Sequence, residues 1–257
     1  MIDVRPIRRE EAEEFLRLLC DVFQLDYRRA EQVFFTEPMF DLSRKWALFE
    51  GPRMVSILTT VPVEFGWGRG FGIAGVATRP ERRREGLAAV LLERVLERSA
   101  KQGEAFALLF AQDPRLYERL GFVVLDRVVR ARLAWHNGKR MGEPLSLERV
   151  QAIYDAWAAG HPSRLRRDAR RWSFWRWNLR VSVEVPGGYA CVEGETLREA
   201  VADAPLRPNG LALGNRWYGL STMAERLELP LADAETAMLF MGRGVPDVPQ
   251  MYLTDQF

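Results

Sequence analysis

The stretch from residue 73 to residue 110 limits the possible folds of this chain more than any other. A short β-rich segment at 73–78 leads into a basic loop. A run with apolar residues at helical spacing then ends at Gly103, and an apolar run of strand length follows at 105–110. A helix between two strands joins parallel neighbours by a right-handed crossover. The sequence therefore predicts an α/β fold in which one parallel strand pair flanks the helix at 86–101.

The periodicity of the remaining residues predicts further elements on both sides of this unit. In the first half we expect helices at 12–23 and 27–35, a hairpin at 46–65, a helix at 114–120 and a β-rich run at 122–135. In the second half we expect helices near 147–159, 162–178 and 221–227, strands at 181–185, 189–192 and 197–202, and an apolar run at 237–241. This order predicts a first domain at 1–135, a polar linker at 136–146 and a smaller α+β domain at 147–257.

Composition argues against several classes of protein. The chain has 37 Lys plus Arg against 35 Asp plus Glu, so it has no long-range field of one sign that would require a nucleic acid or membrane partner. Two cysteines and two histidines are too few for a disulfide framework or a zinc site, and they disfavour a Ser-His-Asp mechanism. The sequence contains no long apolar run and no signal peptide. We therefore expect no metal, no membrane span and a cytoplasmic location.

The loop between 75 and 88 carries the chemistry. It reads Gly75-Val-Ala-Thr-Arg-Pro-Glu-Arg-Arg-Arg-Glu-Gly-Leu-Ala88. The first N–H groups of the following helix lack internal partners and lie at the positive end of its dipole, so an anion can bind there. Gly86 allows close approach of the backbone, and Arg82, Arg83 and Arg84 add positive charge. We infer a site for a diphosphate; the alternative is a solvated basic turn.

Two short motifs give the chain a family resemblance. The spacing Arg83-x-x-Gly86-x-Ala88 resembles the Arg/Gln-x-x-Gly-x-Gly/Ala motif of the GNAT (GCN5-related N-acetyltransferase) superfamily. Tyr117-x-x-x-Gly121-Phe122 resembles the second signature of that family, and the likeness covers residues 1–134. The Arg-Arg-Arg-x-Gly-Leu form and the long second half resemble Eis-like (enhanced intracellular survival type) acetyltransferases, in a chain too short for their third, sterol-carrier-like domain.

The resemblance implies a GNAT fold with a central mixed, splayed sheet, followed by a second α+β half that is like a degenerate GNAT domain. It implies acetyl-coenzyme A (acetyl-CoA) as co-substrate. It assigns cofactor contacts to the strand residues Val76, Ala77 and Thr78 and to the loop and helix residues Arg83, Arg84, Glu85, Gly86, Leu87 and Ala88. The second half would wall the acceptor pocket or form a dimer face, so a homo-oligomer is compatible with it.

Tyr117 is the candidate general acid by the same resemblance. A phenol has a pKa of about 10 and a thiol one of about 8.5, so Tyr117 can keep its proton and still hydrogen-bond a leaving thiolate. The alternative is a ring packed against the sheet. Candidates for the general base are Glu64, Asp113 and the α-carboxylate of Phe257, the last suggested by the Eis-like resemblance. Each has a structural alternative. Glu64 could be a solvated carboxylate at a strand end, Asp113 could start a helix, and Phe257 could belong to an apolar tail docked on the second domain.

The sequence therefore predicts an acetyl-CoA-dependent N-acetyltransferase that acts on a primary amine of a small molecule or a peptide. The alternative is a coenzyme A-binding sensor without turnover. An Arg/Trp-rich run at 164–177 is the one feature that would favour nucleic acid. Its spacing instead favours a core-facing apolar stripe, with Arg166, Arg167, Arg170 and Arg171 on a solvated face.

Overall fold

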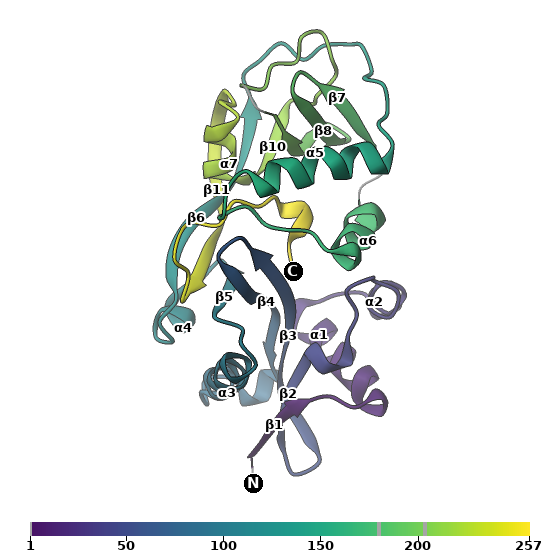
Figure 1. The fold of residues 1–257 in the computed structure, drawn as a ribbon. Coiled ribbons are helices and arrows are strands. Elements are labelled where there is room, and N and C mark those ends of the chain that lie inside the picture. Colours follow the sequence, from purple (N-terminus) through teal and green to yellow (C-terminus); the bar gives the residue numbers. More distant parts are fainter. Residues whose placement is uncertain (1, 179–180, 203–204) are drawn as a thin grey trace.

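The computed structural model describes residues 2–178, 181–202 and 205–257 (Figure 1). The first half contains β1 (Ile2–Pro6), α1 (Ala12–Phe23), α2 (Tyr27–Phe34), β2 (Lys45–Glu50), β3 (Arg53–Phe65), β4 (Gly68–Thr78), α3 (Leu87–Lys101), β5 (Phe106–Ala111), α4 (Arg115–Glu118) and β6 (Val123–Leu133). The second half contains α5 (Leu147–Ala159), α6 (Ala169–Asn178), β7 (Ser182–Val185), β8 (Gly188–Glu193), β9 (Thr196–Val201), β10 (Arg216–Leu220), α7 (Ser221–Arg226) and β11 (Leu231–Arg243).

The elements expected around the basic loop are present. Elsewhere, the structure contains two strands that the sequence does not predict, and one helix begins later than expected. The sequence predicts neither β1 nor β10, because five-residue strands give little periodicity. The helix expected from residue 162 begins only at Ala169, since the preceding segment bridges to β3: the N–H of Arg166 donates to the carbonyl of Glu64 at 2.8 Å. Asp168 then marks the helix start, because its Oδ1 accepts the N–H of Arg171 at 2.7 Å.

Strands from both halves of the chain share one mixed sheet. Among the described residues, its eleven strands follow the order β1-β2-β3-β4-β5-β11-β6-β10-β9-β8-β7. β4 and β5 are parallel, as expected for the strands on either side of α3. β11 lies between β5 and β6 and is antiparallel to both. The domain boundary at residue 135 stays a prediction. In the sheet, β11 from after this boundary lies between β5 and β6 from before it.

β4 and β5 separate part of the way along their length. They pair from Gly70 with Phe106 to Ile73 with Leu109, and β4 then continues to its end paired only with β3. A register shift against β3 marks this point, where Gly75 has a φ of +60°. A bulge of this kind bends a strand away from its neighbour. The sheet is therefore splayed, as the sequence predicts.

Helices cover the two faces of the first half separately (Figure 1). α1 and α2 lie over one face, on a core that includes Phe15, Phe34 and Ala77. α3 and α4 lie over the other face, on a core that includes Leu91 and is packed by Val76. Adjacent residues of β4 thus point to opposite faces. In the part of the chain that the structure describes, no helix is long and apolar enough to cross a membrane.

Candidate active site

The basic loop ends at the first turn of α3, as the sequence predicts. Gly86 directly precedes the helix with a φ of +77°, and no side chain caps this end. A Cβ atom at Gly86 would meet nothing within 4 Å, so the space beside it is open. Uncapped N–H groups at the positive end of a helix dipole bind anions. The geometry fits a diphosphate in front of Leu87 and Ala88.

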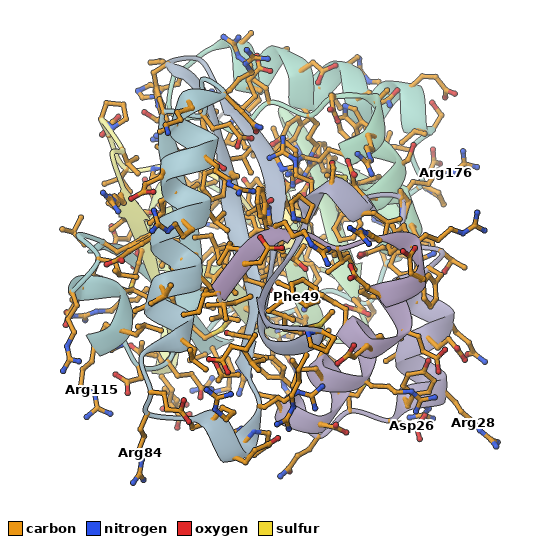
Figure 2. The ribbon with its side chains drawn as sticks, turned by 90° about the horizontal axis from the view of Figure 1, so that it is seen from below. Asp26, Arg28, Phe49, Arg84, Arg115 and Arg176 are labelled. Atoms are coloured by element: carbon orange, nitrogen blue, oxygen red, sulfur yellow. The ribbon has the colours of Figure 1, made fainter. Side chains whose placement is uncertain are left out.

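The loop residues with charged side chains differ in their surroundings. Arg82 is held by two carboxylates, with its guanidinium 2.7 Å from Glu50 and 2.7 Å from Glu85. Hydrogen bonds from Arg82 lower the pKa of both carboxyls. Arg83 and Arg84 are exposed and make no ion pair within the described residues. Figure 2 shows the side chain of Arg84 pointing away from the fold.

The strand residues Val76, Ala77 and Thr78 lie beyond the point where β4 and β5 separate. β3 pairs with one edge of this segment, and no strand pairs with the other edge among the described residues. Unpaired backbone N–H and C=O groups need hydrogen-bond partners. The hydroxyl of Thr78 already lies 2.9 Å from that of Ser56. The backbone rather than the side chains is therefore the part of this segment that could bind a ligand.

Tyr117 lies in α4, on the α3 face of the sheet. Its ring packs edge-on to Phe122, with centroids 6.1 Å apart, against the core that Val76 also contacts. Burial raises the pKa of Tyr117, and the charge of Asp113 adds to this effect. Hydrogen bonds from Arg115 lower the pKa of Asp113 to about 2. Tyr117 therefore retains its proton at neutral pH. Asp113 accepts hydrogen bonds from the backbone and side chain of Arg115 at the start of α4.

A cavity of about 610 Å³ opens on the opposite face of the sheet, beside the β4 bulge. Its walls come from α1, α2, β3, β4, α6 and the end of the chain, and Gly75 and Phe257 both line it. Arg171 and Phe174 of α6 contribute to the same walls, so the second half helps to enclose the cavity. The volume lies in the range of small-molecule sites, roughly 300–1,000 Å³.

The ring of Phe257 lies directly on β4. A Cβ atom at Gly72 would be 2.1 Å from this ring, which explains why glycine is needed there. The ring centroid of Phe110 in β5 is 5.4 Å from that of Phe257. Phe257 thus contacts β4 and β5 next to the place where the two strands separate.

Buried ions hold the segment before Phe257. Arg167 lies 2.6 Å from Asp255 and 2.7 Å from Glu199, and none of these three side chains is exposed. Arg171 is also buried, and it donates to the backbone oxygens of Asp255 at 3.0 Å and Pro62 at 2.6 Å. The prediction of a solvated arginine face is therefore wrong for Arg167 and Arg171, because their partners lie in distant parts of the sequence.

Glu64 lies away from this cavity. Its carboxylate is half-exposed, 3.9 Å from the guanidinium of Arg166. It lines a second cavity, of about 460 Å³, near the end of β3. Glu64 does not line the cavity beside Gly75. Glu64 and Phe257 thus line different cavities, and Arg171 contributes to the walls of both.

An ion pair in the cavity wall is absent from the sequence predictions. Lys45 is almost fully buried, and its Nζ lies 3.3 Å from Glu37 and 4.7 Å from the ring centroid of Phe34. Burial lowers the pKa of Lys45, and the charge of Glu37 opposes this effect. The sequence does contain a signal for this residue: Lys45 is one of three lysines in the chain and directly precedes the apolar run 46–49.

Comparison with known sequences agrees with two features of the site, the anion-binding loop before α3 and the separation of β4 from β5. A family model described as an acetyltransferase (GNAT) domain matches residues 3–125. An uncharacterized N-acetyltransferase of Streptomyces griseus is 28% identical over 198 residues, which are 66% of this chain and 46% of that protein. The chain thus spans about half the length of this relative.

Solved structures share the fold over both halves of the chain. A putative acetyltransferase from Pyrococcus horikoshii is 14% identical, with a TM-score of 0.69 over 98% of this chain and 92% of that one. Eis1 from Mycobacterium abscessus is 16% identical, with a TM-score of 0.62 over 93% of this chain and 73% of that one. Together with the loop at α3 and the splayed strands, the family match leads to one conclusion: residues 3–125 of this chain are similar to a GNAT acetyltransferase domain.

Proposed function

We propose that this protein is an acetyl-CoA-dependent N-acetyltransferase that transfers the acetyl group to a primary amine of a small molecule or a peptide. The observation that carries the proposal is the gap between β4 and β5. The basic loop at 79–86 joins β4 to the uncapped end of α3, and α3 covers one face of the sheet. The cavity beside Gly75 lies on the other face. The two reactants would meet at the gap, each arriving from its own face.

The residues on the α3 side suit acetyl-CoA. The first N–H groups of α3 and the unpaired side chains of Arg83 and Arg84 would bind its phosphates. The free edge of β4 at 76–78 would form hydrogen bonds with the amides of the pantetheine arm. Open space beside Gly86 would admit the diphosphate without displacing protein atoms.

The transfer would be direct. As the amine nitrogen attacks the thioester carbonyl, the C–N bond forms and the C–S bond then breaks. Tyr117 would give its proton to the departing thiolate. Before the attack, the ammonium would give one proton, directly or through water, to the α-carboxylate of Phe257 in a chain that ends at this residue, and the free amine would then attack. The second N–H proton, lost after the C–N bond forms, would return to Tyr117 through solvent. An α-carboxylate has a pKa of about 3.3 to 3.7, so it is ionised at neutral pH.

A thiol-release assay with a panel of primary amines tests the proposal. We expect at least one amine to release coenzyme A faster than hydrolysis does, with an equal amount of acetylated amine detected by mass spectrometry. Calorimetry measures acetyl-CoA binding in parallel. Binding without amine-dependent release would support the alternative, a coenzyme A-binding sensor, and would overturn the proposal.

A further inference from the structure

We propose that the acceptor is an amine with an apolar body and a single positive charge, and that polycationic amines are poor acceptors. This inference rests on the proposed function, because it takes the cavity beside Gly75 as the acceptor site. The argument comes from the chemistry of the cavity walls.

Most of the cavity wall is apolar. Apolar side chains from α1, α2, the turn between them and β3 form it: Leu16, Leu19, Leu25, Val33, Phe34 and Val61. Two of these residues, Leu25 and Val33, are 49% and 47% exposed. Removing such surface from water is favourable, by roughly 25 cal/mol per Å². An apolar occupant would therefore gain affinity by covering these two exposed side chains.

The charged groups of the wall do not favour a polycation. Five charged side chains line the cavity, three basic and two acidic: Arg29, Lys45, Arg171, Asp26 and Glu37. Glu37 is paired with Lys45 at 3.3 Å, and Asp26 accepts the N–H of Arg29 at the start of α2. With three basic and two acidic side chains, the described wall has no excess of negative charge to offset a second ammonium group. Desolvation of that second charge in a mostly apolar cavity is therefore unfavourable.

A single amino group is compatible with these walls because it must lose its proton before it attacks. Removing an ammonium from water disfavours the charged form and lowers its pKa. Gly75 and Phe257 lie at the end of the cavity that adjoins the β4–β5 gap. An acceptor oriented by its apolar body would place its amine at that end.

A homologous series of alkylamines tests the inference. From propylamine to octylamine, we expect kcat/KM to rise about fourfold for each added methylene, which corresponds to ~0.8 kcal/mol per buried CH₂. 1,8-Diaminooctane has the length of octylamine and a second charge, so its kcat/KM and its affinity should be at least tenfold lower. Spermidine and an aminoglycoside should react more weakly still.

Calorimetric binding of octylamine and 1,8-diaminooctane to the coenzyme A complex gives a readout that does not need turnover. Tighter binding of the diamine, or a kcat/KM independent of chain length, would overturn the inference and leave the proposed function standing. Selective binding of octylamine without acetylation of any amine would contradict the proposed function. It would still support the preference of the cavity for an apolar amine with one positive charge.

A pair of matched variants tests whether the acceptor binds in the cavity beside Gly75. Val33→Glu places a charge in the wall, whereas Val181→Glu changes a valine that is equally exposed, at 47%, and does not line the cavity. We expect the first to lower kcat/KM for octylamine at least tenfold with acetyl-CoA affinity unchanged, and the second to have no effect. Equal behaviour of the two variants would place the acceptor elsewhere.

Discussion

Gly86 combines two properties that few other positions of the chain share. Its φ of +77° is rarely adopted by residues with a side chain, and the space around its missing Cβ is empty. The first property sets the entry of the chain into α3, and the second keeps the end of that helix accessible. We therefore expect a side chain here to lower stability through the backbone, and to lower cofactor affinity by occupying this space.

Gly86→Trp should abolish acetyl-CoA binding, because the indole would fill the space needed by the diphosphate. The left-handed backbone adds a stability loss of about 1–2 kcal/mol. Isothermal calorimetry measures the affinity, and urea unfolding measures the free energy of unfolding. Gly194→Trp is the control, because Gly194 has a φ of +58° and equally open surroundings in the turn between β8 and β9. Unchanged acetyl-CoA affinity in a folded Gly86→Trp protein would remove the diphosphate site.

Tyr117→Phe should lower kcat by roughly 10²- to 10⁴-fold, the usual contribution of a general acid. The substitution keeps the ring that packs on Phe122 and deletes only the phenolic proton. Acetyl-CoA affinity should stay close to that of the wild type. Steady-state kinetics between pH 6 and pH 10 provide the measurement. Wild-type turnover under conditions where chemistry limits the rate would show that Tyr117 has a packing role.

At the scale of elements, α6, β9 and the end of the chain are held together by buried charges. Burial alone would raise the pKa of Glu199, but Arg167 opposes this by its charge and hydrogen bonds, aided by hydrogen bonds from Thr254 and Tyr189, and holds the pKa below its usual value. Asp255 shares the same guanidinium. Removing one member would leave a buried charge without a partner.

Arg167→Met should reduce the free energy of unfolding at pH 7 by about 3–5 kcal/mol. In the wild type, the depressed pKa of Glu199 stabilises the fold above the pKa of an unfolded glutamate, and this contribution is lost as the pH falls. In the variant, burial raises the pKa of Glu199, so stability should fall as the pH rises from about 4. Urea unfolding between pH 4 and pH 8 measures both trends.

The control for Arg167→Met is Arg166→Met. Arg166 is half-exposed, and its carboxylate partner Glu64 lies 3.9 Å away. Loss of such a surface pair changes stability by at most about 1 kcal/mol. Equal effects of the two substitutions, or no reversal of the pH dependence for Arg167→Met, would show that the buried network does not anchor the tail.

Extending the chain beyond Phe257 by two glycines should lower kcat at least tenfold with acetyl-CoA affinity unchanged. The extension removes the α-carboxylate from Phe257, while the Phe257 ring can stay on Gly72. Intact-mass spectrometry first establishes that the compared protein ends at Phe257. Full activity of the extended protein would leave Phe257 with a packing role only.

At the scale of the whole molecule, the sequence predicts what is local and misses what joins distant segments. The loop before α3 and the parallel pair around it follow from neighbouring residues, so they were predicted. The contact of Arg167 with Asp255 joins residues 88 positions apart, and the position of β11 between β5 and β6 depends on pairing across the two halves. No periodicity within a single segment encodes such partners.

The shared sheet predicts that residues 1–135 do not fold alone. Without β11, β5 and β6 lose the strand that pairs with both, and the fully buried Phe240 and Met241 leave the core. We expect this fragment to aggregate or to give a poorly dispersed NMR spectrum, whereas the full chain gives a dispersed one. A dispersed spectrum together with acetyl-CoA binding by the fragment would show that the first half is an independent domain.

The most direct measurement is a single-turnover reaction of the full chain with acetyl-labelled acetyl-CoA and octylamine, quenched at intervals and analysed by mass spectrometry. Transfer at the β4–β5 gap predicts that labelled N-acetyloctylamine and free coenzyme A appear together in equal amounts, and that Gly86→Trp produces neither. Coenzyme A release without the labelled amide, or equal product from Gly86→Trp, would contradict acetyl transfer at this site.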